Sequence, residues 1–146
     1  MRHFLRIAVV GVCLALVSAC GSGSFPGAQS SSEPIVGVTL DEFQLQSDTT
    51  SVPAGTVTFR IKNTGKEKHE FVILRTDLAV SGISVDPNTN KVTEEGTGVQ
   101  HVDELDGIDP DHHFDLAVDL KPGRYLLVCN YPGHVHQGMV AFLTAT

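Results

Sequence analysis

Short runs of alternating apolar residues, separated by turn-forming sequences, most constrain the fold of this chain. Val57, Phe59 and Ile61 alternate with polar residues, and residues 114–120 repeat the pattern. Such runs are typical of strands with one buried face. Clusters of Pro, Gly and Asn separate them, and no segment has the period of a long amphipathic helix. The sequence therefore predicts an all-β fold, a β-sandwich of about seven or eight strands over residues 35–146.

Two stretches depart from this regular pattern. The alternation changes phase near Asp41-Glu42, which predicts a β-bulge at that point. Residues 76–110 lack a clear period and contain the turn sequence Asp86-Pro87-Asn88. We therefore expect a long insertion near 76–110 that holds one short helix or strand.

The first nineteen residues have the pattern of a secretory signal peptide. Arg2 and Arg6 make the start basic, and residues 7–17 form an apolar run that is short for a membrane span. Small residues then precede Cys20, an ending that resembles a bacterial lipobox. This resemblance implies cleavage before Cys20 and lipidation of that cysteine. The alternatives are an ordinary secretory signal or a short membrane anchor.

Three parts of the chain follow from this interpretation: a signal peptide at 1–19, a flexible Gly/Ser linker at 20–34 and a domain at 35–146. We expect an extracytoplasmic protein held by its lipid on the bacterial cell membrane or outer membrane. The whole chain has 10 basic and 17 acidic side chains, for a formal charge of −7. Loss of the signal peptide removes two arginines and no acid, which leaves 8 basic side chains and a charge of −9. Such acidity argues against nucleic acid as a partner, and we expect a monomer.

The cysteine count directs attention to one thiol. Cys13 would leave with the signal peptide and Cys20 would carry lipid, so Cys129 would be the only free thiol of the mature protein. Outside the cytoplasm a lone thiol is a liability unless it has a use.

Cys129 begins a short loop with the spacing Cys-x4-His-x4-Met, which places His134 and Met139 after it. A thiolate, an imidazole and a thioether that converge on one ion favour copper. His69 is expected to point inward, because it shares a strand face with the apolar Phe71 and Ile73. The four residues predict a mononuclear copper site with two histidines, a cysteine and a weak axial methionine.

Each of these ligands has an alternative interpretation. Cys129 could be a small buried apolar residue, and Met139 could simply belong to the core. His136 competes with His134 for the loop position, although the Pro132-Gly133 turn directly precedes His134. Zinc would accept two histidines and a cysteine but gains little from a thioether.

Residues 35–146 resemble the cupredoxins, the family of type 1 blue copper proteins. The Cys-x4-His-x4-Met loop is similar to that of the rusticyanin and sulfocyanin branch, and Thr58–Phe71 resembles the strand that carries the first histidine ligand. The resemblance implies a Greek-key sandwich with one copper ion at one end and single-electron transfer. Many cupredoxins have Asn or Ser directly after that histidine. Here Glu70 follows His69, and we expect its side chain to lie in solvent.

These observations favour an electron carrier over an enzyme, because the extra histidine sets of a copper reductase or oxidase are missing. The alternative is a copper scavenger or chaperone of the cell envelope. The surface that contacts redox partners is predicted around Tyr131, Val135 and His136. Between Val92 and Leu120 the chain has nine acids and no Lys or Arg.

The usual interpretation of such an acidic run is a solvated surface. It would alternatively steer a basic redox partner, such as a cytochrome or an oxidoreductase. His101, His112 and His113 lie in the same part of the chain. They are expected to be solvated, with an accessory metal site as the alternative.

Overall fold

The computed structural model describes residues 32–146, so the signal peptide, Cys20 and most of the linker lie outside the described residues. The described chain is almost entirely β-structure and has one short 3-10 helix, η1 (Val80–Gly82). Eight strands have four or more residues: β1 (Ile35–Asp41), β2 (Gln44–Ser47), β4 (Gly55–Asn63), β5 (His69–Thr76), β8 (Val99–Ile108), β9 (His113–Leu120), β10 (Gly123–Val128) and β11 (Val140–Ala145). Three have only two residues: β3 (Ser51–Val52), β6 (Val85–Asp86) and β7 (Lys91–Val92). Within residues 32–146, no helix is long and apolar enough to cross a membrane.

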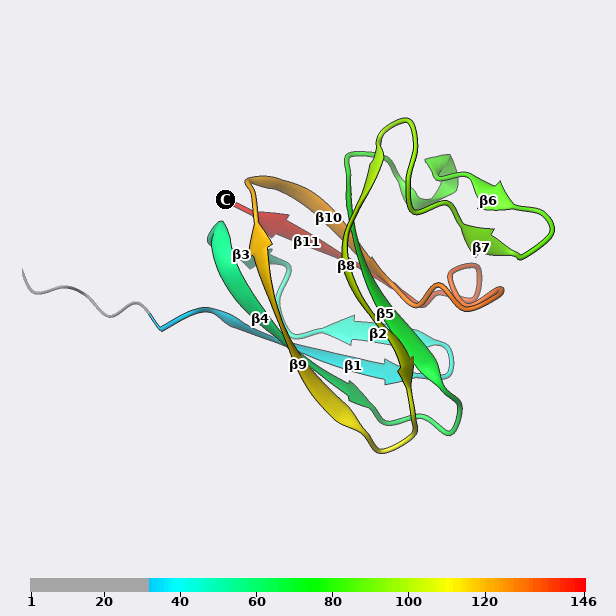
Figure 1. Cartoon of the computed structure of the whole chain (residues 1–146), viewed down its shortest axis with the longest axis horizontal. Helices are drawn as coiled ribbons and strands as arrows, with labels where there is room; N and C mark the ends of the chain where they lie inside the picture. Colours follow the sequence, from blue (N-terminus) through cyan, green and yellow to red (C-terminus); the bar gives the residue numbers. More distant parts are fainter. Residues whose placement is uncertain (1–31) are drawn as a thin grey trace, which may run out of the picture. The chain divides into compact units, whose positions relative to one another are not determined.

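Two sheets form the body of the domain (Figure 1). The first has the order β2-β1-β4-β9, and the second has the order β3-β11-β10-β5-β8. Two pairs, β1 with β4 and β3 with β11, are parallel, and the remaining pairs of the two sheets are antiparallel. Neighbours such as β5 and β10 are far apart in sequence, as expected of Greek-key connections. The predicted all-β sandwich is confirmed.

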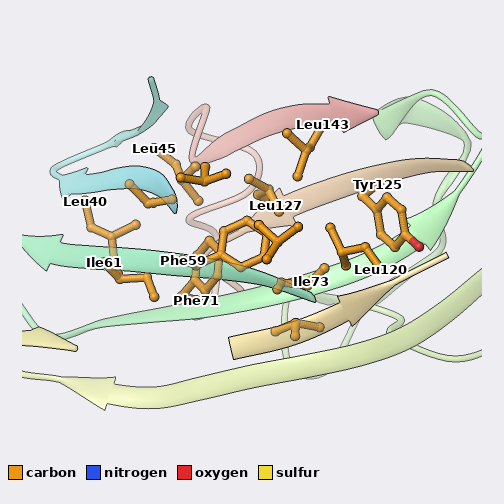
Figure 2. Packing of buried hydrophobic residues seen from close by; sticks show 14 of the residues in the cluster. Leu40, Leu45, Phe59, Ile61, Phe71, Ile73, Leu120, Tyr125, Leu127 and Leu143 are labelled. Carbon is orange, nitrogen blue, oxygen red and sulfur yellow. The ribbon is translucent and has the colours of Figure 1, made fainter. Parts of the chain in front are cut away.

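The main core fills the space between the two sheets (Figure 2). Phe59 and Ile61 from β4 meet Phe71 and Ile73 from β5, and all four are completely buried. The rings of Phe59 and Phe71 lie 5.5 Å apart. Burial of each such side chain stabilises the fold by about 1.5–3 kcal/mol. The inward face predicted for His69 is therefore fixed by its strand neighbours.

The predicted insertion at 76–110 is shorter than expected. Residues 99–108 form β8, the edge strand of the second sheet, so the insertion covers only residues 77–98. The register of β8 against β5 shifts twice, between His69 and Phe71 and between Ile73 and Leu74. Each shift adds one residue to β8, which breaks the alternation that identifies a strand.

The phase change near Asp41-Glu42 is a turn and not a bulge. Asp41 pairs with Gln44, so the two residues between them connect β1 to β2 as a tight hairpin. The predicted bulge was wrong. A tight turn and a bulge both shift the alternation of apolar and polar residues by one position, so the sequence pattern does not distinguish them. This turn lies at the same end of the domain as the residues described below.

A second apolar cluster covers the outer face of the larger sheet. Val72, Leu74, Leu126 and Val128 point away from the main core and pack against residues of the insertion, including Ile83. Strand β5 is consequently buried on both faces, with only Arg75 partly exposed. Figure 1 shows the β6–β7 hairpin of the insertion beside the loop that follows β10.

Candidate metal centre

Three of the predicted ligands converge at one end of the sandwich. Cys129 Sγ lies 3.7 Å from His69 Nδ1 and 3.3 Å from His134 Nδ1. The three side chains form one of two groupings with metal-ligand geometry among the described residues. His69 and Cys129 are completely buried, and His134 is 8% exposed.

The turn before β5 positions His69. Asn63 ends β4, and its completely buried side chain donates hydrogen bonds to the carbonyls of Glu67 (2.7 Å) and Ile108 (2.9 Å). Its side-chain oxygen accepts a bond of 2.9 Å from the N–H of Gly65. One amide therefore satisfies three backbone groups and fixes the turn from which His69 enters the core.

The loop between β10 and β11 is held by its own backbone. Cys129 N–H donates to the carbonyl of Met139 (3.1 Å), and Met139 N–H donates to the carbonyl of His134 (3.1 Å). Met139 is completely buried in the main core. Gly133 has a φ of 83°, which favours glycine, and its N–H bonds to Asn90 of the insertion. These contacts bring the ends of the Cys-x4-His-x4-Met loop together.

The surroundings of the site favour a neutral imidazole at His134 and disfavour ionisation of the Cys129 thiol. Burial, together with the nearby His69, lowers the pKa of His134, which favours the neutral ring with one nitrogen free to bind a metal ion. Burial raises the pKa of Cys129, while the backbone N–H of Glu70 opposes this by donating to Sγ at 3.3 Å. A bound metal ion would supply the positive charge that the thiolate lacks.

Sequence reasoning missed Glu42, which lies in the tight turn between β1 and β2. Its Oε1 accepts hydrogen bonds of 2.8 Å from the backbone N–H groups of Lys66 and Glu67. The same oxygen lies 3.2 Å from His69 Nε2. Chiefly the bond from Glu67, with those from Lys66 and His69, lowers the pKa of Glu42 to about 2. The carboxylate thus faces the far side of the His69 ring, and the only signal in the sequence was the change of phase.

Glu70 differs from its expected place in solvent. It points away from the main core, as predicted, but it is only 4% exposed because the insertion covers this face of the sheet. Its Oε2 has no hydrogen-bond partner and lies 3.7 Å from Lys91 Nζ.

The three residues predicted to contact redox partners differ in their exposure to solvent. His136 is exposed and lies outside both metal-type groupings, and Tyr131 is half-buried with its ring 5.8 Å from that of His134. Val135 does not belong to a contact surface, because it is 7% exposed and packs into the cluster on the outer face. The ring of Phe43, which was not predicted, lies 5.1 Å from that of His134 in an edge-to-face arrangement.

The geometry fits one soft or borderline ion. Two donors bound at about 2.0–2.3 Å, with angles of 100–120° between them, lie about 3.3–3.8 Å apart. The separations from Cys129 Sγ fall within this range. Thiolate and imidazole donors, with a buried thioether on the same loop, are the combination that favours copper over zinc, magnesium or calcium.

Comparisons with known proteins agree with the fold. The family model described as "Cupredoxin-like domain" matches residues 7–141. Reduced auracyanin from the photosynthetic bacterium Roseiflexus castenholzii superposes with a TM-score of 0.56 at 21% identity, over 79% of this chain and 98% of that one. An azurin from Methylomonas sp. strain J gives 0.56 at 18% identity, over 79% and 99% of the two chains.

Auracyanin A from Chloroflexus aurantiacus, which is described as a "blue" copper protein, gives 0.55 at 20% identity over 79% and 100%. A multi-copper oxidase from Pediococcus acidilactici matches over 80% of this chain but only 27% of its own length, with a TM-score of 0.53 at 18% identity. No curated protein sequence matches significantly. At these identities the structural likeness establishes the fold alone.

Proposed function

The chain belongs to the cupredoxin-like domain family, and from that premise we propose that it binds one type 1 copper ion and transfers single electrons between redox partners. The observation that supports this proposal is the buried convergence of His69, Cys129 and His134 at one end of the sandwich. Met139 is the proposed axial ligand, because it is buried and closes the same loop.

The protein's own residues would hold the ligands still during electron transfer. When bound, copper would supply the one-electron chemistry by alternating between two oxidation states. Backbone hydrogen bonds close the 129–139 loop, and Asn63 fixes the turn before His69. A rigid ligand set lowers the reorganisation needed at each change of charge. Burial excludes water and favours the less charged form of the site.

His134 is the proposed route of electrons to the surface. His69, Cys129 and Met139 are 0% exposed, whereas His134 is 8% exposed. The rings of Phe43 and Tyr131 pack edge-to-face with its ring. A partner would therefore dock around this ring, with His136 at the rim, and not over Val135.

We further propose that the domain acts as a monomer outside the cytoplasm and is tethered to a membrane through lipid on Cys20. The support is the sequence pattern of residues 1–20 together with the Gly/Ser-rich linker. The partners would be redox proteins, with a basic surface if the acidic run steers them.

Mass spectrometry of the membrane fraction tests the anchor, because lipidation adds acyl chains to an N-terminal Cys20. An N-terminus upstream of Cys20, or an unmodified one, would contradict it.

The test of the copper proposal is the visible spectrum of copper-loaded protein. Wild type should show an intense thiolate-to-Cu(II) band that disappears on reduction by one electron and returns on oxidation. Cys129→Ser should lack the band, while His136→Ala should keep it because His136 is exposed and outside the site. A colourless wild type with bound Cu(II) would refute the type 1 assignment. A blue protein that releases Cu(I) without cycling would instead favour the scavenger function.

A further inference from the structure

Two buried polar atoms in residues 32–146 lack any hydrogen-bond partner, Glu70 Oε2 and His101 Nε2. Buried polar groups are nearly always bonded, so each exception requires an explanation such as an ion. His101 lies on β8, the edge strand of the larger sheet, and Glu70 lies on the neighbouring strand β5.

The free nitrogen of His101 faces two carboxylates. His101 Nε2 lies 3.5 Å from an oxygen of Glu104, three residues further along β8, and 3.8 Å from an oxygen of Glu94 in the insertion. Both separations are too long for hydrogen bonds. The three ligand atoms lie within 4.8 Å of one another and form the second grouping with metal-ligand geometry in the described chain.

These separations match the distance between two ligand atoms that bind the same metal ion. A nitrogen and an oxygen bound to Zn²⁺ at about 2.0–2.2 Å lie about 3.4–3.6 Å apart at tetrahedral to trigonal angles. The observed 3.5 and 3.8 Å are within a few tenths of an ångström of this range. Imidazole and carboxylate donors without a thiolate suit a borderline divalent ion.

The neighbours of the cluster include a buried amide, which binds Glu94, and a buried carboxylate. The second oxygen of Glu94 accepts a 2.6 Å bond from Asn130, a buried side chain. Glu70 is more than nine-tenths buried, and its Oε2 is unpartnered. Lys91 Nζ lies 3.7 Å from this oxygen, and its charge offsets part of that of the carboxylate.

We propose that Glu94, His101 and Glu104 form a second metal site, separate from the Cys129 centre, which takes a borderline divalent cation such as Zn²⁺. The cation would join Glu94 of the insertion to the edge strand β8. One of its ligands, Glu94, is bonded to Asn130, the residue that follows Cys129 in the chain.

The test is a titration of copper-loaded protein with Zn²⁺ alone, in competition with a colorimetric chelator. Wild type should bind one Zn²⁺ with its blue band unchanged. His101→Ala and the isosteric Glu104→Gln should each weaken this binding at least about tenfold, because each removes one of only three protein donors. The matched control is His113→Ala, an exposed histidine outside the cluster, which should bind Zn²⁺ like wild type.

Three results would overturn the proposal: no Zn²⁺ uptake by wild type, equal uptake by wild type and both cluster variants, or a blue band that fades in step with Zn²⁺ uptake. The same titration in Cys129→Ser separates this proposal from that of copper binding. That variant keeps Glu94, His101 and Glu104 and lacks the thiolate, so it should still bind one Zn²⁺ even if the Cys129 centre holds no copper.

Discussion

At the scale of single residues, the imidazole of His69 is held from both sides. Its Nδ1 faces Cys129 Sγ, and its Nε2 faces the carboxylate of Glu42 at 3.2 Å. A ligating histidine commonly donates its second N–H to such an acceptor, which fixes the tautomer and makes the ligand a stronger donor. Two backbone N–H groups hold the carboxylate in turn. Glu42 therefore positions the ligand and places a negative charge near the proposed copper.

We expect Glu42→Gln to raise the midpoint potential of the copper by roughly some tens of millivolts, because loss of a negative charge destabilises Cu(II) more than Cu(I). Protein-film voltammetry measures the shift. Glu67→Gln is the matched control, since Glu67 is an exposed acid in the turn before β5, two residues from His69, with no side-chain bond to a ligand. Equal shifts in the two variants would show that the contact with His69 has no special role.

Asn63 gives a second prediction for a single residue. Asn63→Ala removes an amide that bonds three backbone groups in a buried site. At a net 0.5–1.5 kcal/mol per hydrogen bond, we expect the free energy of unfolding to fall by about 2–4 kcal/mol. Chemical denaturation checks the value. Asn88→Ala, in the exposed turn of the insertion, should change it by less than about 0.5 kcal/mol, and a similar loss in both variants would contradict the proposed role of the turn.

At the scale of elements, the insertion is part of the support of the site. Residues 77–98 cover the outer face of β5 and β10 and bond to the 129–139 loop through Asn130 and Gly133. Asn130 exchanges two hydrogen bonds with the backbone of Val92 in β7. The loop that carries His134 is therefore packed between the sandwich and the insertion.

Val135 tests this packing. Val135→Asp would place a charge in the apolar cluster under the insertion, and we expect it to lower the free energy of unfolding by about 2 kcal/mol or more. His136→Asp changes the exposed neighbour and should leave stability almost unchanged. Thermal unfolding of the two metal-free variants makes the comparison. A stable Val135→Asp protein would show that the cluster contributes little.

The predictable parts of the structure were those with simple alternation or chemically distinctive residues. The runs around Phe59 and Phe71 predicted strands and their inward faces, and the soft donors of the 129–139 loop directed attention to the metal-type site. The two bulges hid β8, because each extra residue reverses which side chains face inward. Val135 and Glu70 were assigned to the surface because no local pattern shows that a distant insertion covers them.

At the scale of the whole molecule, some of the acidic side chains between Val92 and Leu120 form ion pairs. Asp115 pairs with Arg60 at 2.9 Å, and Asp109 pairs with Lys68 at 3.0 Å. The domain nevertheless remains acidic overall, with a formal charge of −7 for the whole chain. Such a field attracts positively charged reactants over about the Debye length.

We expect the reduced protein to react with a cationic one-electron oxidant at a rate that falls as salt rises from 0.01 to 0.2 M. The rate with an anionic oxidant should rise over the same range, because screening removes repulsion. Stopped-flow decay or growth of the blue band gives both rates. If the two oxidants showed the same salt dependence, electrostatic steering of partners would be excluded.

The direction of β1 has a consequence for the tethered protein. The strand begins at Ile35, just after the linker, and ends at Asp41, next to the turn that touches His69. Its seven residues span about 20 Å, so the chain enters the domain at one pole and the proposed copper lies at the other. Any attachment made through the chain ahead of Ile35 would therefore reach the domain at the pole opposite the proposed copper.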